Sequence, residues 1–168
     1  MDIWTPDNLQ NHLTENSIPA EIVHLEEETP TVPAAAEALG VSTDQIVKTV
    51  IFLIDDSPYA VLANGVRRVD SRKLATRFGV NRKKVKLADG EAVTRITGYA
   101  PGTVPPVGHR QSAPVLMDPS VRDQEVVYAG GGGIMALLRI RSEDLLHITS
   151  AELLDVLEAP KSDETGNA

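Results

Sequence analysis

Cysteine is absent from the sequence, which excludes disulfide bonds, thiolate metal sites and cysteine nucleophiles. No apolar run approaches the ~18 residues that a membrane-spanning helix needs. The first residues also lack the basic and then apolar stretches of a secretory signal. We therefore expect a cytoplasmic protein with no membrane partner.

Sequence motifs for metal, phosphate-loop and serine-hydrolase chemistry are missing as well. None of the four histidines stands at metal-ligand spacing from another histidine or an acid. The phosphate-loop residues GK[ST] and the G-x-S-x-G elbow do not occur. We expect neither a metal nor a cofactor. His109 follows Gly108 at the end of an irregular loop and is interpreted as a solvated loop histidine; the alternative is that it reaches a site.

Length and composition favour one folded domain. The chain has 168 residues, of which 42% are hydrophobic, and both values lie in the range of a single globular domain. We expect this domain to occupy residues 1–158. The polar residues 159–168 are expected to form a disordered tail.

The net charge of −8 conceals a strongly basic segment, defined here as residues 67–86. This segment holds nine basic residues and one acid, Asp70, whereas the rest of the chain holds 7 basic and 23 acidic residues. Such asymmetry can direct an anionic ligand to one face of a protein. The alternative is a basic surface that contacts only solvent.

Turn signals and apolar spacing predict a mixed α/β domain around one sheet or a partial barrel. Caps and glycine stops predict helices near residues 6–13, 31–40, 70–79 and 89–98, and one turn at 42–45. Alternation predicts strands at 21–25, 47–54, 59–63, 85–87, 114–117, 125–129 and 134–140. Residues 55–58 should form a hairpin connection, and residues 130–133 should separate the last two strands. A helical turn should begin at Ser142, and a final helix should span residues 150–157.

Lys48 stands on the strand predicted at residues 47–54, on the face that also carries Val50, Phe52 and Ile54. Burying an unpaired ammonium on an apolar face is costly. The side chain therefore either lies along apolar surface with its ammonium in water or points into a pocket, toward an anionic or carbonyl oxygen.

Two glycine-containing segments could approach a ligand closely. Residues 99–108 read YAPGTVPPVG, and three prolines with two glycines forbid regular structure there. At Gly102 the backbone could come near a ligand, and free N–H groups of a rigid loop can stabilise an oxyanion; the alternative is an ordinary connection. The glycines at 130–133 lie between strands, which favours close packing against a ligand or a neighbouring strand over a phosphate loop.

These pieces, in this order, resemble the YbaK and prolyl-tRNA synthetase-associated domain family. Its members are free-standing aminoacyl-tRNA editing deacylases related to an editing domain inserted in the synthetase. The matching segments are VPAAAEALGV at 32–41, IVKT at 46–49, DSRKLATRFG at 70–79, GYAPGTVPPVG at 98–108, and the strand and glycine turn at 125–133. The resemblance extends over residues 20–158.

The resemblance implies a mixed, barrel-like sheet with flanking helices and a pocket that hydrolyses misacylated tRNA. Lys48 matches the family lysine needed for activity, and Gly102 and Pro106 match the ends of the family's G-x-x-x-P loop. The expected catalytic residues are therefore Lys48 and Gly102. The expected substrate-binding residues are Thr49, Thr103, Val104, Pro106, Gly130 and Gly131. The expected tRNA-binding residues are Arg67, Arg68, Arg72, Lys73, Arg82, Lys83 and Lys84.

Hydrolysis of an aminoacyl-tRNA ester also fits what the sequence contains. The neighbouring ribose hydroxyl activates this ester, so positioning and oxyanion stabilisation can suffice. Lys48 would hold the ribose or a substrate oxygen, and N–H groups near Gly102 would polarise the carbonyl that water attacks. The expected substrate is a small amino acid on tRNA, such as alanine on tRNA(Pro).

The expected partners are the tRNA acceptor end and prolyl-tRNA synthetase, and no DNA. Two alternatives remain open. One is a non-catalytic module of the same fold that binds an aminoacylated RNA end or a protein partner. The other is a regulator that senses a small amino acid.

Overall fold

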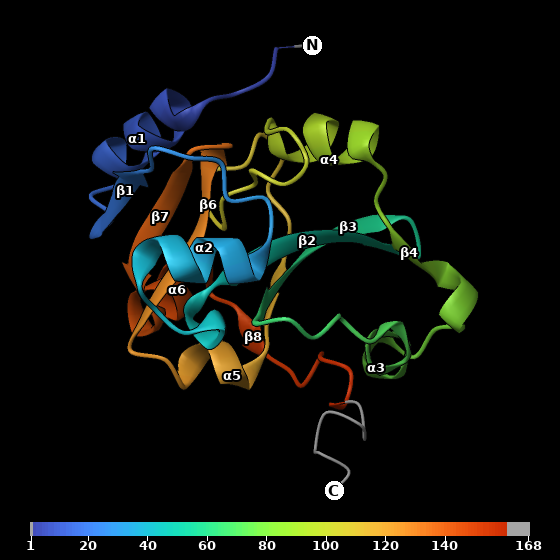
Figure 1. The fold of residues 1–168 in the computed structure, drawn as a ribbon. Helices are drawn as coiled ribbons and strands as arrows, with labels where there is room; N and C mark the ends of the chain where they lie inside the picture. The colour runs from blue at the N-terminus through green and yellow to red at the C-terminus, as the bar shows by residue number, and fades with distance from the viewer. Residues whose placement is uncertain (1, 161–168) are drawn as a thin grey trace, which may run out of the picture.

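The structure, a computed structural model, describes residues 2–160. Its strands form two sheets, a larger one of order β4-β2-β3-β5-β8 and a smaller one of order β1-β7-β6 (Figure 1). The strands are β1 (Ala20–His24), β2 (Val47–Ile54), β3 (Ser57–Asn64), β4 (Val85–Leu87), β5 (Val115–Met117), β6 (Val126–Gly133), β7 (Ala136–Arg141) and β8 (Glu152–Leu153). The helices are α1 (Pro6–Glu15), α2 (Val32–Leu39), α3 (Ser71–Phe78), α4 (Gly90–Thr97), α5 (Pro119–Arg122) and α6 (Ser142–Thr149), with short 3-10 turns η1 (Thr43–Gln45) and η2 (Arg82–Lys84).

The centre of the larger sheet is the antiparallel hairpin of β2 and β3, which pairs from Val47–Asn64 to Ile54–Ser57. Its turn consists of Asp55 and Asp56 alone, and both have a positive φ. A two-residue turn needs this conformation to match the twist of the two strands. The predicted connection at 55–58 is therefore two residues too long. β4 and β5 flank the hairpin, β4 antiparallel to β2 and β5 parallel to β3.

Among the described residues, the backbones of the two sheets pair at one parallel bridge, between Ile46 and Tyr128. Beside it, Leu62 and Met117 of the larger sheet belong to the same core cluster as Leu138 of the smaller sheet. The sheets lie against each other there without closing into a barrel. The prediction of a mixed α/β domain is confirmed, and the barrel-like sheet is an open pair of sheets that share one bridge and a hydrophobic core.

Helices cover both faces of the larger sheet, as Figure 1 shows for α3 and α4 on opposite sides of the hairpin. On one face, Leu74 of α3 packs with Phe52 and Ile54 of β2. On the other face, Ile96 of α4 packs with Ile51. The predicted alternation along β2 is thereby confirmed. α2 covers the corner between the sheets, where Ala35 and Ala36 contact Ile46.

Local capping signals identified the helix ends correctly. The N-caps of α1 to α4 are Thr5, Thr31, Asp70 and Asp89, and α2, α3 and α4 end at Gly40, Gly79 and Gly98. Each capping side chain accepts a hydrogen bond from a backbone N–H of the first turn, which would otherwise lack a partner.

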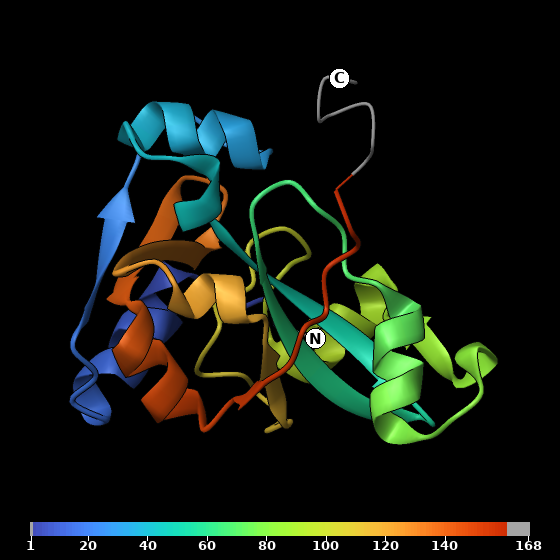
Figure 2. The ribbon, with the colours of Figure 1, turned by 90° about the horizontal axis from the view of Figure 1, so that it is seen from below.

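The helix predicted at residues 150–157 is wrong. α6 is a full eight-residue helix that stops at Ser150, whose φ of 51° is left-handed. The chain then forms β8 and continues as an extended segment, residues 154–158, which we call the C-terminal strap. It crosses the molecule beside β3 and reaches the start of α3 (Figure 2). There Leu157 bridges to Val69, and Val156 accepts a hydrogen bond from Asp70 N–H.

The glycine run was also misplaced. Gly130 and its neighbours are part of β6, with an irregularity in the β6–β7 register between Gly130 and Gly133. The turn to β7 falls at Ile134 and Met135. The short helix α5, capped by Asp118, was not predicted.

No helix within residues 2–160 is long and apolar enough to cross a membrane. Of the tail predicted at 159–168, residues 161–168 lie outside the described part of the chain.

Candidate functional site

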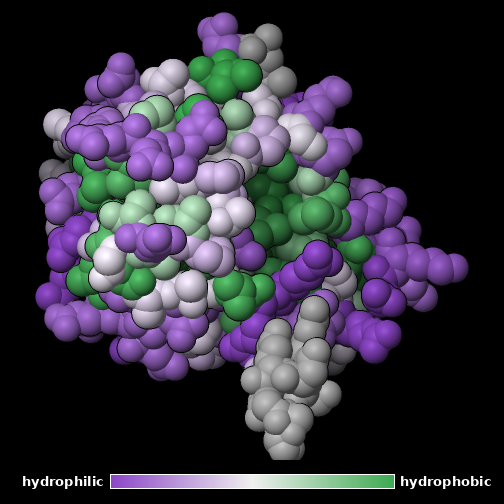
Figure 3. All heavy atoms as spheres, viewed as in Figure 1, coloured by the Kyte–Doolittle hydropathy of each residue, from purple (hydrophilic) through white to green (hydrophobic). Residues whose placement is uncertain are grey.

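A cavity of about 320 Å³ opens where the larger sheet is incomplete. β4 pairs with β2 only at residues 52–54, and β6 bridges to it only at Ile46. Between these contacts one edge of β2 has no neighbouring strand. The cavity occupies this gap, and every residue from Ile46 to Ile51 lines it. Figure 3 shows a hollowed hydrophobic area with a hydrophilic rim on this side of the molecule.

The cavity walls come from six further elements. They are the start of α2, the end of β4, helix α4, the loop at 101–104, and strands β6 and β7. Most of the side chains are small or aliphatic, such as Val32, Val93 and Leu137. Among the lining residues of the described chain, Lys48 is the one charged side chain, and none is Asp, Glu or His.

Lys48 lies at this open edge and is half-buried. Burial lowers the pKa of its ammonium, and the positive charge of Arg68 lowers it further. No carboxylate within residues 2–160 forms an ion pair with it. An unpaired, partly desolvated ammonium at the wall of a cavity can donate a hydrogen bond to a carbonyl, hydroxyl or phosphate oxygen of a ligand.

The loop at 101–104 forms the opposite rim. Gly102 is exposed and has a φ of +85°, and a Cβ there would meet only open space. Thr103 N–H and the Thr103 hydroxyl both donate to Ala100 O. Gly102 N–H, by contrast, has no acceptor among the described residues. A free backbone donor therefore lies at the mouth of the cavity.

The loop is held in place from behind by β6 and by His109. A Cβ at Gly130 would lie 2.7 Å from the Val104 carbonyl carbon, so only glycine permits this contact. Gly132 N–H donates to Thr103 O. His109 Nε2 bonds with Pro105 O at 2.6 Å.

His109 is not the solvated loop residue that we expected. It is half-buried, and its pKa is lowered by burial and by the charge of His12, against the raising effect of the Pro105 hydrogen bond. Its contact with the Pro105 carbonyl makes it part of the loop's support.

Five of the predicted catalytic and substrate-binding residues line the cavity, namely Lys48, Thr49, Gly102, Val104 and Gly130. Three do not. Thr103 belongs to the loop but is buried. Pro106 lines a second hollow with His12 and His109, and Gly131 packs against the Ala136 backbone. The hydroxyl oxygen of Thr49 is buried and has no partner among the described residues.

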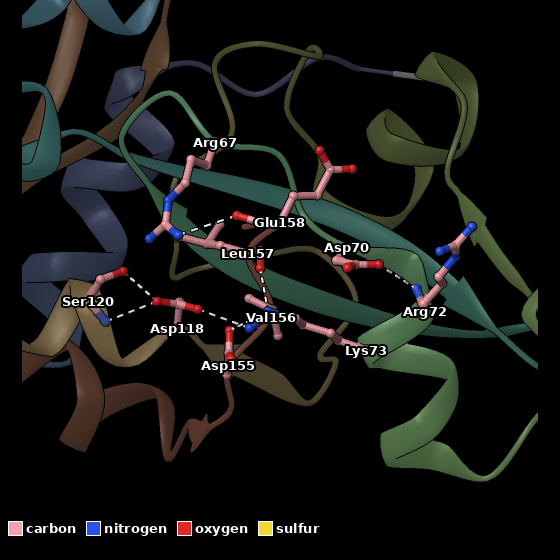
Figure 4. A network of polar contacts seen from close by, with 10 residues as sticks. All are labelled: Arg67, Asp70, Arg72, Lys73, Asp118, Ser120, Asp155, Val156, Leu157 and Glu158. Carbon is pink, nitrogen blue, oxygen red and sulfur yellow. Dashed lines mark hydrogen bonds and ion pairs between the residues drawn. The ribbon is translucent and has the colours of Figure 1, made fainter. Parts of the chain in front are cut away.

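The predicted RNA-binding residues divide into two groups. Arg67 and Lys73 hold the C-terminal strap through Glu158 O and Leu157 O, and Lys73 also pairs with Asp155 (Figure 4). Exposed side chains with no side-chain hydrogen bond or ion pair within residues 2–160 are Arg68, Arg72, Arg82, Lys83 and Lys84. These five remain available to a ligand.

Several lining residues were not foreseen, among them Val32, Leu87, Val93 and Leu137. They are ordinary apolar residues of predicted helices and strands, and only the tertiary packing brings them together. Leu87 alone carried a signal, because it is an apolar residue directly after the basic segment. No cluster of metal-ligating side chains occurs within residues 2–160.

The chain is similar to known proteins over most of its length. A proline–tRNA ligase from Thermoanaerobacter sp. (strain X514) is 28% identical over 113 residues, covering 66% of this chain and 19% of the ligase. The chain thus spans less than a fifth of that ligase. The uncharacterized protein YwhH of Bacillus subtilis (strain 168) is 25% identical over 139 residues, covering 82% of this chain and 87% of YwhH.

A crystal structure described as that of a proposed trans-editing enzyme for prolyl tRNA synthetase superimposes with a TM-score of 0.85 at 32% identity. The match covers 92% of this chain and 97% of that one. The family model of the aminoacyl-tRNA editing domain matches residues 26–148, which include the cavity and both of its rims. The chain therefore belongs to the aminoacyl-tRNA editing domain family.

Proposed function

We propose that the protein is a trans-acting deacylase that hydrolyses a small amino acid from misacylated tRNA. The observation that carries this proposal is that two unpartnered donors line one cavity. They are the Lys48 ammonium and the Gly102 N–H. A cation and a backbone donor are what an ester needs for binding and for stabilising its oxyanion. Family membership supports the same chemistry.

The proposed mechanism relies on positioning. The Lys48 ammonium donates to a ribose or carbonyl oxygen and fixes the ester at the open edge of β2. Gly102 N–H donates to the carbonyl oxygen as negative charge develops there. Water attacks the carbonyl carbon, the ester C–O bond breaks, and the ribose oxygen leaves with a proton. Since no Asp, Glu or His lines the cavity within residues 2–160, the neighbouring ribose hydroxyl is the proposed proton carrier.

The cavity lining suggests the class of amino acid. Apart from Lys48 its side chains are neutral, and most are aliphatic or small, so a cationic side chain of the substrate would find no counter-ion there. Lys48, the one cation, is assigned to the ester, and an uncharged, small side chain fits the rest of the lining. The similarity to proline–tRNA ligases points to tRNA(Pro). We therefore propose alanine on tRNA(Pro) as the substrate and prolyl-tRNA synthetase as the partner whose error is corrected.

Single-turnover deacylation of a panel of charged tRNAs tests the proposal. Alanyl-tRNA(Pro) should be hydrolysed and prolyl-tRNA(Pro) spared. Lys48→Ala should lose about 100-fold or more in rate while its circular dichroism spectrum is unchanged, because one charge-stabilising donor contributes about that much. Binding of alanyl-tRNA without release of alanine would instead favour the non-catalytic module, and wild-type activity of the variant would remove Lys48 from the site.

A further inference from the structure

Leu87, the last residue of β4, is unusually placed for a large apolar side chain. It is 66% exposed, more than any other large hydrophobic residue in the described chain, yet it lines the cavity. Pro101, on the loop that forms the opposite rim, is also exposed and also lines the cavity. The mouth is therefore bordered by apolar surface that nothing within residues 2–160 covers.

The sheet register places Leu87 on the same face of β2 as Lys48. Leu87 pairs directly with Phe52, and cross-strand partners lie on one face of a sheet. Lys48 precedes Phe52 by four residues and so lies on that face too. At about 3.3 Å per residue, roughly 13 Å of strand separates the positions of Lys48 and Phe52. The cavity extends along this interval.

Positive charges lie on both sides of the apolar rim. Lys83, Lys84 and Lys86 directly precede Leu87 in the chain and are exposed. On the Lys48 side, the charge of Arg68 is close enough to act on the lysine. Cations attract phosphates, and an apolar platform between them suits the flat face of a base.

We propose that Leu87, together with Pro101, binds the base of the terminal nucleotide of the aminoacylated RNA. This inference rests on the proposed function, because the ester must lie between Lys48 and Gly102 for its nucleoside to reach the mouth. The sugar then follows the Lys48 face of β2, and the base lies on Leu87. The phosphates continue toward Lys84 and Lys86.

Two small esters test the base site. One is the alanyl ester of adenosine, and the other is the alanyl ester of anhydroribitol, which keeps the esterified ribose oxygen and the free hydroxyl next to it but lacks the base. Wild type should hydrolyse the adenosyl ester with a kcat/KM about fivefold or more higher, through a lower KM, because contact with Leu87 and Pro101 removes apolar surface of the base from water, at about 25 cal/mol per Å². Leu87→Ser should remove this preference, and Leu87→Trp should increase it.

The matched control is Leu153→Ser, which removes an exposed leucine that does not line the cavity and should leave both rates unchanged. A wild type that hydrolyses both esters equally, or a Leu87→Ser variant that loses activity equally on both, overturns the base site alone. Alanyl-tRNA(Pro) in the same assay separates the two failures. If it is hydrolysed and the adenosyl ester is not, the base site alone is overturned; if it is not hydrolysed, the proposed function fails and the base site with it.

Discussion

Lys48 carries a charge in a place where charge is costly, and this has a consequence for the pH dependence of activity. Burial and the charge of Arg68 both lower the pKa of its ammonium below the ordinary value of 10.5. If the protonated form is required, deacylation should decline as pH rises through the lowered pKa, earlier than for an exposed lysine. The enzymatic rate is measured against pH after subtraction of the uncatalysed hydrolysis.

Substitution of Arg68 separates the two causes of the lowered Lys48 pKa, which are burial and the charge of Arg68. In Arg68→Gln the coulombic contribution is gone, so the decline should move to higher pH. The control Arg82→Gln removes an exposed charge that has no resolved effect on Lys48, and its profile should match wild type. A profile that stays in place in Arg68→Gln would mean that Lys48 is not the group that titrates.

Gly102 is the second residue on which the site depends. Gly102→Val should lose about 100-fold in kcat, because the loop would leave its left-handed conformation and the β-branched side chain would fill the cavity mouth. Gly40→Val is a matched control, since Gly40 also has a positive φ with open space around it but lies at the far end of α2. Both variants should lose about 1–2 kcal/mol of unfolding free energy, and only Gly102→Val should lose activity.

At the scale of elements, the C-terminal strap depends on one buried carboxylate. Asp118 accepts hydrogen bonds from the Ser120 hydroxyl, Ser120 N–H and Val156 N–H (Figure 4). Burial raises its pKa, but these hydrogen bonds outweigh burial and the net pKa is lowered. The carboxylate therefore joins the cap of α5 to the strap.

Asp118→Ala should lower the free energy of unfolding by about 2–3 kcal/mol, because it removes a helix cap and leaves buried N–H groups without a partner. Urea denaturation at neutral pH measures this. Asp155→Ala is the control, since Asp155 has a 74% exposed side chain and pairs only with Lys73, so it should lose at most about 1 kcal/mol. The stabilisation by Asp118 is present above the unfolded carboxyl pKa and should disappear as pH falls through the lowered folded pKa.

The elements also show how far the sequence could be interpreted. Helices α2, α3 and α4 were predicted with their ends because caps and glycine stops are local signals. Residues 150–157 were misassigned because leucines at 153, 154 and 157 mimic helical spacing. Their extended form depends on pairing with β5 and with Val69, which are distant in the chain. The second half of β6 was not predicted as a strand, because its glycines have no side chains and so show no alternation of apolar and polar residues.

The residues of the candidate site likewise fall into those that the sequence could identify and those that it could not. Lys48 and Gly102 could be selected from the sequence, because an ammonium on an apolar strand and a glycine in a proline-rich loop are locally unusual. Val93, Leu137 and Val32 could not be selected, because an aliphatic residue at a cavity looks the same in sequence as one in the core. Arg67 and Lys73 could not be distinguished from their free neighbours without the strap that they hold.

For the whole molecule, the asymmetric charge should decide where RNA binds. Reversal to Glu at Arg82, Lys83 and Lys84 should weaken tRNA binding and flatten its salt dependence, whose slope is about −0.7 for each single-strand phosphate neutralised. Hydrolysis of a small alanyl ester should be unaffected, because the cavity is unchanged. Binding titrations at several salt concentrations measure the slope.

The control for this prediction is a second triple variant that has the same net charge as the first. Reversal at Arg122, Arg139 and Arg141 changes the charge by the same amount at exposed positions outside the basic segment. It should alter the salt slope much less. Equal slopes for the two triple variants would mean that net charge alone governs binding and that η2 does not contact the RNA.

The strap also fixes the order in which the molecule can be completed during synthesis. Val156 and Leu157 are fully or almost fully buried, and Val156 belongs to the cluster that contains Phe52 and Leu74. The ribosome adds these two residues long after the strands and helix that they cover. A nascent chain can therefore form the β2–β3 hairpin and α3 early, but that side of its core stays open to water until the strap emerges. Until then the partly made protein presents a hydrophobic surface suited to chaperones.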